Sequence, residues 1–257
     1  MSPEVHPLRA FYASPGGQVA ARLVRDRLAA IWPRLPGQTV LGIGHAAPYL
    51  SLWQAEAQRV IALVPEHGSP VRWPADGPGR TLLAEGERLP FPDLSFDRIL
   101  MVHGLEAAEN ARAMLREAWR VLRDDGRLVV VVPNRVGMWA QVERTPFGHG
   151  QPYSAGQLSR LLARHMFRVE RLEAALFVPP YGLRLLGLGA EMLERAGRLA
   201  CPRLGGVAIL EAEKDIFAAI PAGAVATRRR VLVTERGAAR VGAVGRDEVR
   251  SRTPDRC

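Results

Sequence analysis

The chain has 257 residues, of which 47% are hydrophobic and 24% are charged, a balance typical of a globular protein with a sizeable core. Its longest apolar runs are far shorter than the roughly 20 residues of a membrane-spanning helix, and its N-terminus lacks an apolar signal core, so we expect neither a membrane span nor export. Most of the net charge of +9 lies in residues 221–257, which hold nine Arg and four acidic residues, and this location argues against a nucleic-acid-binding domain.

Helical and strand-like segments alternate along the chain up to residue 220. Ser14 is placed to cap a first helix, because apolar residues recur at helical spacing from Val19 to Ile31. Residues 127–133 form the clearest strand, and their uninterrupted valines predict burial on both faces. Further strands are predicted at residues 39–43, 59–64, 80–84, 95–102, 168–178 and 207–216, and further helices at residues 106–122, 154–165 and 183–199.

This order of segments predicts an α/β fold. Alternating strands and helices favour parallel βαβ units, and two strands after the fifth one fit a seven-stranded sheet better than the six-stranded dinucleotide-binding sheet. We therefore expect a three-layer, Rossmann-like architecture, in which a mostly parallel sheet of seven strands carries helices on both faces. The predicted domain covers residues 1–220, with residues 1–38 as an N-terminal helical cap, and residues 221–257 are predicted to be a basic, disordered tail.

A glycine-containing turn, Gly42-Ile43-Gly44-His45-Ala46-Ala47, follows the first predicted strand. A glycine there removes the side chain that would keep the backbone from a ligand, and the N–H groups that follow favour polar or negative ligand groups. Gly42, Gly44 and His45 are therefore candidate cofactor-binding residues. The Gly-x-Gly-x-x-Ala spacing also fits a nicotinamide dinucleotide fingerprint, and a tight turn without a ligand is a third interpretation.

Two longer segments carry a resemblance to a known family. Residues 84–106 have the sequence AEGERLPFPDLSFDRILMVHGLE, and residues 115–134 have the sequence LREAWRVLRDDGRLVVVVPN. Together they resemble the region from the third to the fifth strand in class I S-adenosylmethionine-dependent methyltransferases of type 11, and they are similar to the ubiquinone and biotin biosynthesis methyltransferases. The resemblance is strong from about residue 39 to residue 134. It implies S-adenosylmethionine as the cofactor and methyl transfer to a small-molecule acceptor as the activity.

The resemblance also assigns individual residues by position. Glu85 corresponds to the acid that accepts a hydrogen bond from the adenine amino group, and the N–H of Gly86 would bind the adenine ring. Leu89 would cover one face of the adenine. His103, directly after the fourth strand, corresponds to a position beside the methionine end of the cofactor. The structural alternatives are a solvated carboxylate at Glu85 and a histidine satisfied by backbone groups at His103.

The first motif departs from the family pattern. The family usually has an acid where this chain has Gly42, and its Gly-x-Gly-x-Gly is here Gly44-His45-Ala46-Ala47-Pro48. The acid that the family places after the second strand, where it would bind the ribose hydroxyls, is replaced by Val64. Glu66, two residues further on, is the candidate ribose-binding residue, and a solvated loop glutamate is the alternative. These departures support the hypothesis of a catalytically silent member of the family.

Three residues are candidates for catalysis: His103, His149 and Tyr153. The sulfonium makes the methyl group strongly electrophilic, so positioning the acceptor supplies much of the acceleration, and a base is needed only for a reluctant nucleophile. His149 and Tyr153 belong to residues 143–154, whose glycines would permit a mobile lid, and a plain connecting loop is the alternative. Tyr12 is a candidate to fold over the cofactor, although core packing explains it equally well.

The residues alone leave three functions open: a small-molecule methyltransferase, a silent methyltransferase-fold binding protein, and an NAD(P)-binding oxidoreductase. RNA binding through the arginine-rich tail is disfavoured. The two cysteines, Cys201 and Cys257, match neither a disulfide framework nor a metal-binding spacing, so we expect a cytoplasmic protein without a bound metal. The sequence determines neither the methyl acceptor nor the oligomeric state.

Overall fold

The computed structural model describes residues 5–65, 72–142, 145–148, 150–180 and 189–217, with side chains from Leu8 onward. All of these residues belong to the first of the two units into which the chain divides, Met1–Ile220. The predicted tail and two candidate site residues, Glu66 and His149, lie outside the described residues. Within the described ranges, no helix is both long enough and apolar enough to cross a membrane.

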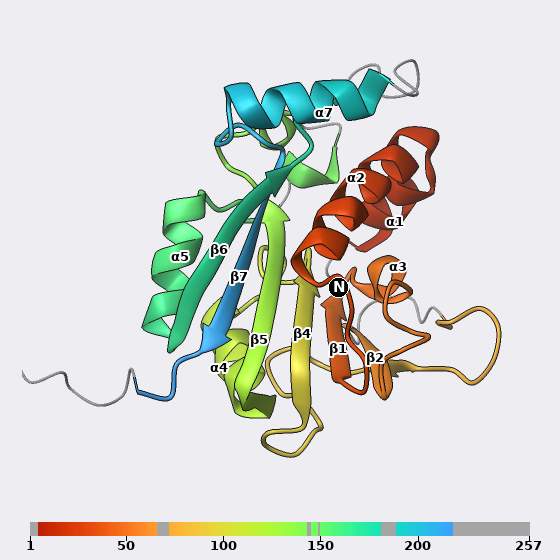
Figure 1. Ribbon diagram of the computed structural model, residues 1–257, viewed down its shortest axis with the longest axis vertical. Helices are drawn as coiled ribbons and strands as arrows, with labels where there is room; N and C mark the ends of the chain where they lie inside the picture. Colours follow the sequence, from red (N-terminus) through yellow and green to blue (C-terminus); the bar gives the residue numbers. More distant parts are fainter. Residues whose placement is uncertain (1–4, 66–71, 143–144, 149, 181–188, 218–257) are drawn as a thin grey trace, which may run out of the picture. The chain divides into compact units, whose positions relative to one another are not determined.

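Seven strands form a single sheet (Figure 1). They are β1 Thr39–Gly44, β2 Arg59–Val64, β3 Thr81–Leu83, β4 Phe96–Val102, β5 Leu122–Pro133, β6 Phe167–Ala175 and β7 Val207–Lys214. Their order in the sheet is β3-β2-β1-β4-β5-β7-β6. β7 runs antiparallel to both of its neighbours, and the other described pairs are parallel. The predicted seven-stranded, mostly parallel sheet is therefore confirmed.

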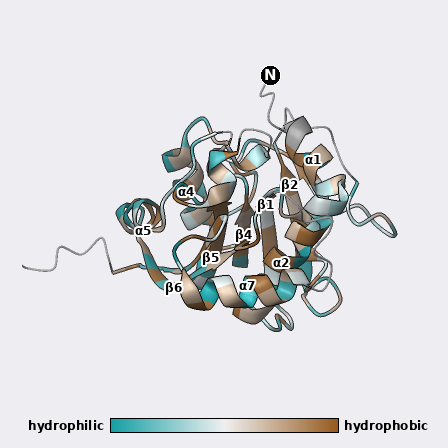
Figure 2. Cartoon of the chain, turned by 90° about the horizontal axis from the view of Figure 1, so that it is seen from above, coloured by the Kyte–Doolittle hydropathy of each residue, from teal (hydrophilic) through white to brown (hydrophobic). Residues whose placement is uncertain are grey.

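Helices cover both faces of this sheet, as the view from above shows (Figure 2). They are α1 Val5–Ala13, α2 Pro15–Ile31, α3 Ala47–Leu50, α4 Ala111–Val121, α5 Ala155–Arg164 and α7 Gly189–Ala200, with short 3-10 turns at Met138–Gln141 and Pro146–Gly148. β5 serves both layers, because Val129 and Val131 pack into the cluster that contains α2, while Val130 and Val132 pack into the cluster that contains α4 and α5. Burial on two faces explains the uninterrupted valines of this strand.

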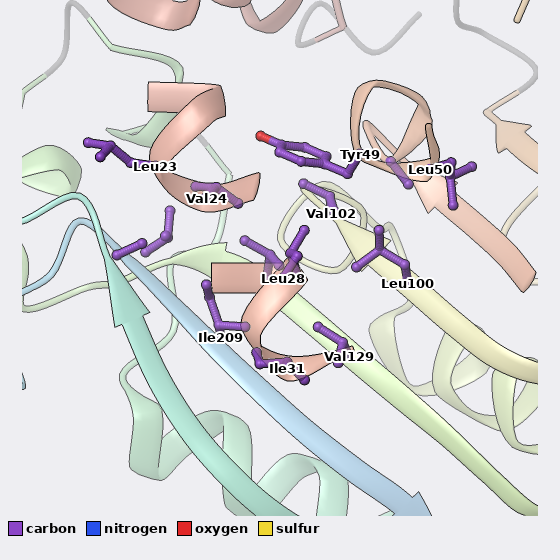
Figure 3. Packing of buried hydrophobic residues seen from close by; sticks show 14 of the residues in the cluster. Leu23, Val24, Leu28, Ile31, Tyr49, Leu50, Leu100, Val102, Val129 and Ile209 are labelled. Carbon is purple, nitrogen blue, oxygen red and sulfur yellow. The ribbon is translucent and has the colours of Figure 1, made fainter. Parts of the chain in front are cut away.

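The cluster on the α2 side joins the first long helix to the middle of the sheet (Figure 3). The apolar stripe predicted from sequence spacing is the buried face of α2. The cluster includes Leu23, Val24, Leu28 and Ile31 from the helix and Leu100, Val129 and Ile209 from the strands.

Capping side chains fix where several helices begin. Ser14, as predicted, accepts a hydrogen bond from a backbone N–H in the first turn of α2, and Ser154 does the same in α5. The predicted helix 106–122 begins only at Ala111, because the side chain of Asn110 accepts a hydrogen bond from the Ala113 N–H and caps α4. Residues 106–110 are therefore a loop that follows β4.

Two strand ends also differ from the prediction. β5 begins at Leu122 rather than at residue 127, since a register shift between Phe96 and Arg98 lets the pairing with β4 continue. β6 ends at Ala175 rather than at residue 178, because Leu176 has a φ of 66° and leaves the extended conformation.

Asp97 joins the amino ends of β1 and β4. Its carboxylate accepts hydrogen bonds of 2.7 Å from both the N–H and the hydroxyl of Thr39 and pairs with Arg123 at 2.7 Å. Partial burial raises the pKa of Asp97, but the Thr39 hydrogen bonds and Arg123 outweigh it and lower the pKa. The same alignment places Gly44 beside Val102 at the opposite end of the two strands.

Parallel strands bring their carboxyl ends to one rim of the sheet. β1, β2, β3 and β4 are parallel neighbours. Gly44 ends β1, Glu85 follows β3 and His103 follows β4. These three candidate residues therefore lie along the same rim, as the sequence interpretation requires.

Candidate active site

The turn after β1 closes directly onto the end of β4. The N–H of His45 donates a 2.7 Å hydrogen bond to the carbonyl of Val102. Gly44 has a φ of 76°, and a Cβ at this position would lie 2.5 Å from the Val102 oxygen. Glycine is therefore required here by the approach of two strands, whether or not a ligand is bound.

The space beside Gly42 is already filled by the protein. A Cβ on Gly42 would lie 2.6 Å from Leu50 Cδ1 and 2.8 Å from the Cβ of Ala46. Ala46 and Leu50 both belong to the buried cluster on the α2 side. An acidic side chain at position 42 would have to displace these groups, so the departure from the family's first motif is built into the packing of α3.

A chain of three side chains crosses the rim at the end of β4. The Tyr12 hydroxyl lies 2.8 Å from Nε2 of His103, and Nδ1 of the same ring lies 2.6 Å from Oε1 of Glu106. In the tautomer with its proton on Nδ1, the ring donates to the Glu106 carboxylate and leaves Nε2 to accept a hydrogen bond from the Tyr12 hydroxyl. His103 itself has a φ of 51°, a conformation that residues with a Cβ rarely adopt.

Tyr12 also covers the turn after β1. Its ring stacks on the imidazole of His45, with centroids 4.6 Å apart and an interplanar angle of 17°. Burial lowers the pKa of His45 to about 3, and the neighbouring His103 and Arg9 add to this effect. Burial likewise raises the pKa of Tyr12 well above its usual value, with Tyr49 and Glu106 contributing. Both side chains are therefore uncharged at neutral pH.

Three buried polar atoms at this place lack a hydrogen-bond partner among the described residues. They are Nε2 of His45, Oε2 of Glu106 and the hydroxyl of Tyr49, which lies beside Tyr12. Buried polar atoms in proteins are nearly always hydrogen-bonded. These atoms mark positions at which a bound ligand or a water molecule would complete the site.

An aromatic cover joins α1 to the segment that follows β5. The ring of Phe147 lies 5.1 Å from the imidazole of His103, 5.4 Å from Phe11 and 5.0 Å from Trp139, measured between centroids. Trp139 is anchored by a 2.8 Å hydrogen bond from its Nε1 to the carbonyl of Val178. This cover shields the His103 imidazole from solvent on the side that Phe147 occupies.

The residues after β3 occupy the neighbouring part of the rim. Glu85 is exposed, and Gly86 is partly exposed in the turn that follows it. A Cβ on Gly86 would lie 2.5 Å from Cε of Met114. Leu89 is 3% exposed and packs in the core on the α4 side, so its side chain holds the loop in place rather than presenting an open surface to a ligand.

Tyr153 lies in the segment between β5 and α5. It pairs with Asn134 in an isolated bridge after β5 and is partly buried. Burial raises the pKa of Tyr153, and the charge of Glu106 adds to the shift. The structure thus brings Tyr12, His45 and His103 together, while Tyr153 approaches this group only through Glu106.

Sequence reasoning missed Glu106, Phe147 and Trp139. The signal for Glu106 was its position three residues after His103, but the pairing depends on a loop where the sequence predicted a helix. No local signal identified the two aromatic residues, because their contacts with Phe11 and His103 join segments that are far apart in the chain.

Comparison with known proteins finds relatives for part of the chain that carries this site. Residues 39–130 match the family profile of a methyltransferase domain. The demethylmenaquinone methyltransferase of Thermus thermophilus is 30% identical over 155 residues, which cover 60% of this chain and 63% of that protein. The 27-O-demethylrifamycin SV methyltransferase of Amycolatopsis mediterranei is 30% identical over 138 residues, which cover 49% of this chain and 51% of that protein. The chain therefore spans less than two thirds of the length of these curated relatives.

A solved structure extends the comparison to the whole sheet. The S-adenosylmethionine-dependent methyltransferase of Thermotoga maritima superposes with a TM-score of 0.55 at 17% identity and covers 82% of this chain and 96% of its own. At this identity the likeness concerns the fold alone. Residues 39–130 are therefore similar to a methyltransferase domain, and the seven-stranded sheet around them has the fold of this solved structure.

Proposed function

We propose that this protein transfers a methyl group from S-adenosylmethionine to a small-molecule acceptor, and that His103 removes the proton from that acceptor. The observation that carries the proposal is the buried imidazole at the end of β4, whose Nδ1 is held by Glu106 and whose Nε2 faces a hydroxyl. By their names, the relatives in Thermus and Amycolatopsis methylate demethylmenaquinone and 27-O-demethylrifamycin SV, which are small molecules.

The residues at the rim fit the cofactor at both of its ends. The exposed carboxylate of Glu85 and the N–H of Gly86 would satisfy the adenine amino group and a ring nitrogen. Glu106 Oε2 is a buried acceptor without a partner among the described residues, and the rings of Tyr12 and Phe147 provide aromatic faces for a cationic group. When bound, S-adenosylmethionine supplies a methyl group activated by a positively charged sulfur. The Glu66 carboxylate stays a proposal for the ribose hydroxyls.

The side chains around His103 orient its imidazole and shield it from water. Glu106 fixes the tautomer of the imidazole, so Nε2 is the basic nitrogen. The Tyr12 hydroxyl already donates to this nitrogen, and an acceptor hydroxyl that took its place would make the same hydrogen bond. Phe147 and Trp139 exclude water, which preserves the strength of this hydrogen bond. Within the described residues, Tyr153 makes no direct contact with His103. We therefore place Tyr153 beside the bound acceptor rather than in the role of the base.

The other interpretations of the sequence gain no support from these observations. The antiparallel β7 between β5 and β6 differs from a six-stranded dinucleotide-binding sheet, and the relatives described above are methyltransferases. A silent member of the family would lack the activity but not the fold. The cytoplasmic location and the small-molecule acceptor stay predictions of the sequence.

The substitution His103→Asn tests the proposed role of the imidazole. Asn adopts positive φ more readily than most residues, so the backbone at this position can be kept while the basic nitrogen is lost. We expect S-adenosylhomocysteine to bind this variant as it binds the wild type, and turnover to fall about 100-fold or more. The measurement is the conversion of S-adenosylmethionine to S-adenosylhomocysteine with a panel of small phenols, alcohols and amines, with His165→Asn as the matched control.

Two results would reject the proposal. A wild-type protein that neither binds S-adenosylhomocysteine nor turns over any acceptor in the panel would be a silent member of the family. A His103→Asn variant with wild-type turnover would leave methyl transfer standing and would remove His103 from the reaction.

A further inference from the structure

A hollow lies between α4 and α5, apart from the turn after β1. Its volume is about 760 Å³, and it is lined by the start of α4, by residues 150–153 and by one side of α5. Tyr153 and Leu161 in its wall pack against the core on the α4 and α5 side of the sheet. Tyr12 and Ala46, which follows Gly44 in the turn after β1, belong to the core cluster on the opposite side of the sheet.

The charged side chains of this hollow are predominantly positive. Arg112, Arg135, Arg160 and Arg164 line it, and Glu109 is the acidic residue among the lining groups. None of these four arginines forms an ion pair with a carboxylate of the described residues. In contrast, other arginines of the same part of the chain are paired; Arg120 contacts both Asp93 and Glu117 at 2.7 Å.

Two helices also begin at the hollow. The hollow includes Asn110 and Ala111, where α4 begins, and Gln157 in the first turn of α5. The amino end of a helix carries partial positive charge, which favours an anion. Guanidinium groups bind carboxylate and phosphate oxygens through paired hydrogen bonds. Asn110 and Ser154 already cap these two helices, and the Glu87 carboxylate accepts from the Asn110 N–H, so the preference for an anion rests on the four arginines.

The wall of the hollow also adjoins the residue that holds His103. The N–H of Gln151 donates a 3.1 Å hydrogen bond to the Glu106 carbonyl. A Cβ on Gly150 would lie 2.7 Å from the same oxygen. Gly150 and Gln151 both line the hollow. A ligand bound there would thus lie against the loop that supports the proposed base.

We propose that the hollow between α4 and α5 binds an oxyanion, a carboxylate or a phosphate, and that this group belongs to the methyl acceptor. The assignment of this group to the methyl acceptor rests on the proposed function, whereas the anion site itself does not. The acceptor would then be an acidic small molecule, anchored by the arginines while its methylated atom reaches the side of the rim where His103 lies.

The test is isothermal titration of the full-length protein at low salt with two probes, inorganic pyrophosphate and citrate. The variant Arg160→Gln/Arg164→Gln removes two lining charges, and Arg116→Gln/Arg195→Gln removes two exposed arginine charges that are not part of the hollow. We expect the lining variant to bind the preferred probe at least roughly tenfold more weakly than the wild type, and the control variant to bind it as the wild type does. Preference for pyrophosphate or for citrate identifies a phosphate or a carboxylate ligand.

The same samples are titrated with S-adenosylhomocysteine, so that the two proposals can fail separately. Unchanged S-adenosylhomocysteine binding in the lining variant is expected. If the wild type binds pyrophosphate or citrate but not S-adenosylhomocysteine, the anion site stands and the proposed function fails. If neither anion binds, or if both variants lose affinity equally, the anion site is rejected; the equal loss would assign the binding to general positive charge such as that of residues 221–257.

Discussion

His103 shows how the chemistry of the site depends on single residues. Its position after a buried strand was visible in the sequence, and its partner Glu106 is only three residues away. Its other partner, Tyr12, is 91 residues away. No periodicity in the sequence predicts which hydroxyl meets which imidazole, because that contact depends on how α1 packs over the sheet. The sequence could thus identify the candidate base but not its hydrogen-bonded environment.

His45 gives a pH-dependent prediction at the same scale. Burial holds its pKa at about 3 in the folded protein, whereas the unfolded chain takes up the proton near pH 6.5. Below pH 6.5 the unfolded state therefore binds one more proton than the folded state, and the folded protein loses stability as the pH falls. At pH 5 this loss amounts to about 2 kcal/mol.

The variant His45→Phe keeps a ring to stack on Tyr12 but cannot titrate. We expect the free energy of unfolding of the wild type to fall more steeply between pH 7 and pH 5 than that of the variant. Urea unfolding at several pH values measures the two slopes. Equal slopes would show that the imidazole of His45 takes up a proton in the folded protein as readily as in the unfolded chain.

At the junction of β1 and β4, the turn after β1 contacts the end of β4 through backbone atoms. The sequence predicted both strands and the glycine turn between β1 and α3. It left open whether Gly44 makes room for a ligand or forms a tight turn without one, and the structure places the Val102 carbonyl against this residue. The start of α4 also differs from the prediction, because Asn110 caps the helix at a later residue than the sequence indicated. An amphipathic pattern does not reveal where the first turn of a helix begins.

Comparing Gly44→Ala with Gly37→Ala separates the cost of backbone strain at positive φ from the cost of crowding against β4. Gly37 has a φ of 71° and no atom within 4 Å of an added Cβ, while Gly44 has a φ of 76° and the Val102 oxygen at 2.5 Å. We expect Gly37→Ala to cost about 1–2 kcal/mol from backbone strain alone. Gly44→Ala should cost about 1–3 kcal/mol more, because β4 must move. Denaturant unfolding measures both; equal losses would contradict the crowded junction.

At the scale of the whole described unit, strand order decides which residues meet. The alternation of strands and helices was sufficient to predict seven strands and two helical layers, since burial on both faces leaves a clear apolar pattern. The same topology brings Gly44, Glu85 and His103 to one rim, although they are separated by many residues. The hollow between α4 and α5 could not be predicted, because its arginines come from three separate segments.

The most direct test of the central claim, that this rim binds the adenosine part of S-adenosylmethionine, is isothermal titration with S-adenosylhomocysteine. Wild-type protein is compared with Glu85→Ala and with Asp76→Ala, which removes another exposed carboxylate from the segment between β2 and β3. We expect the wild type and Asp76→Ala to bind equally and Glu85→Ala to bind roughly tenfold more weakly, as expected for the loss of a hydrogen bond to a charged group. No heat with the wild type at millimolar ligand, or equal binding by Glu85→Ala, would contradict the claim.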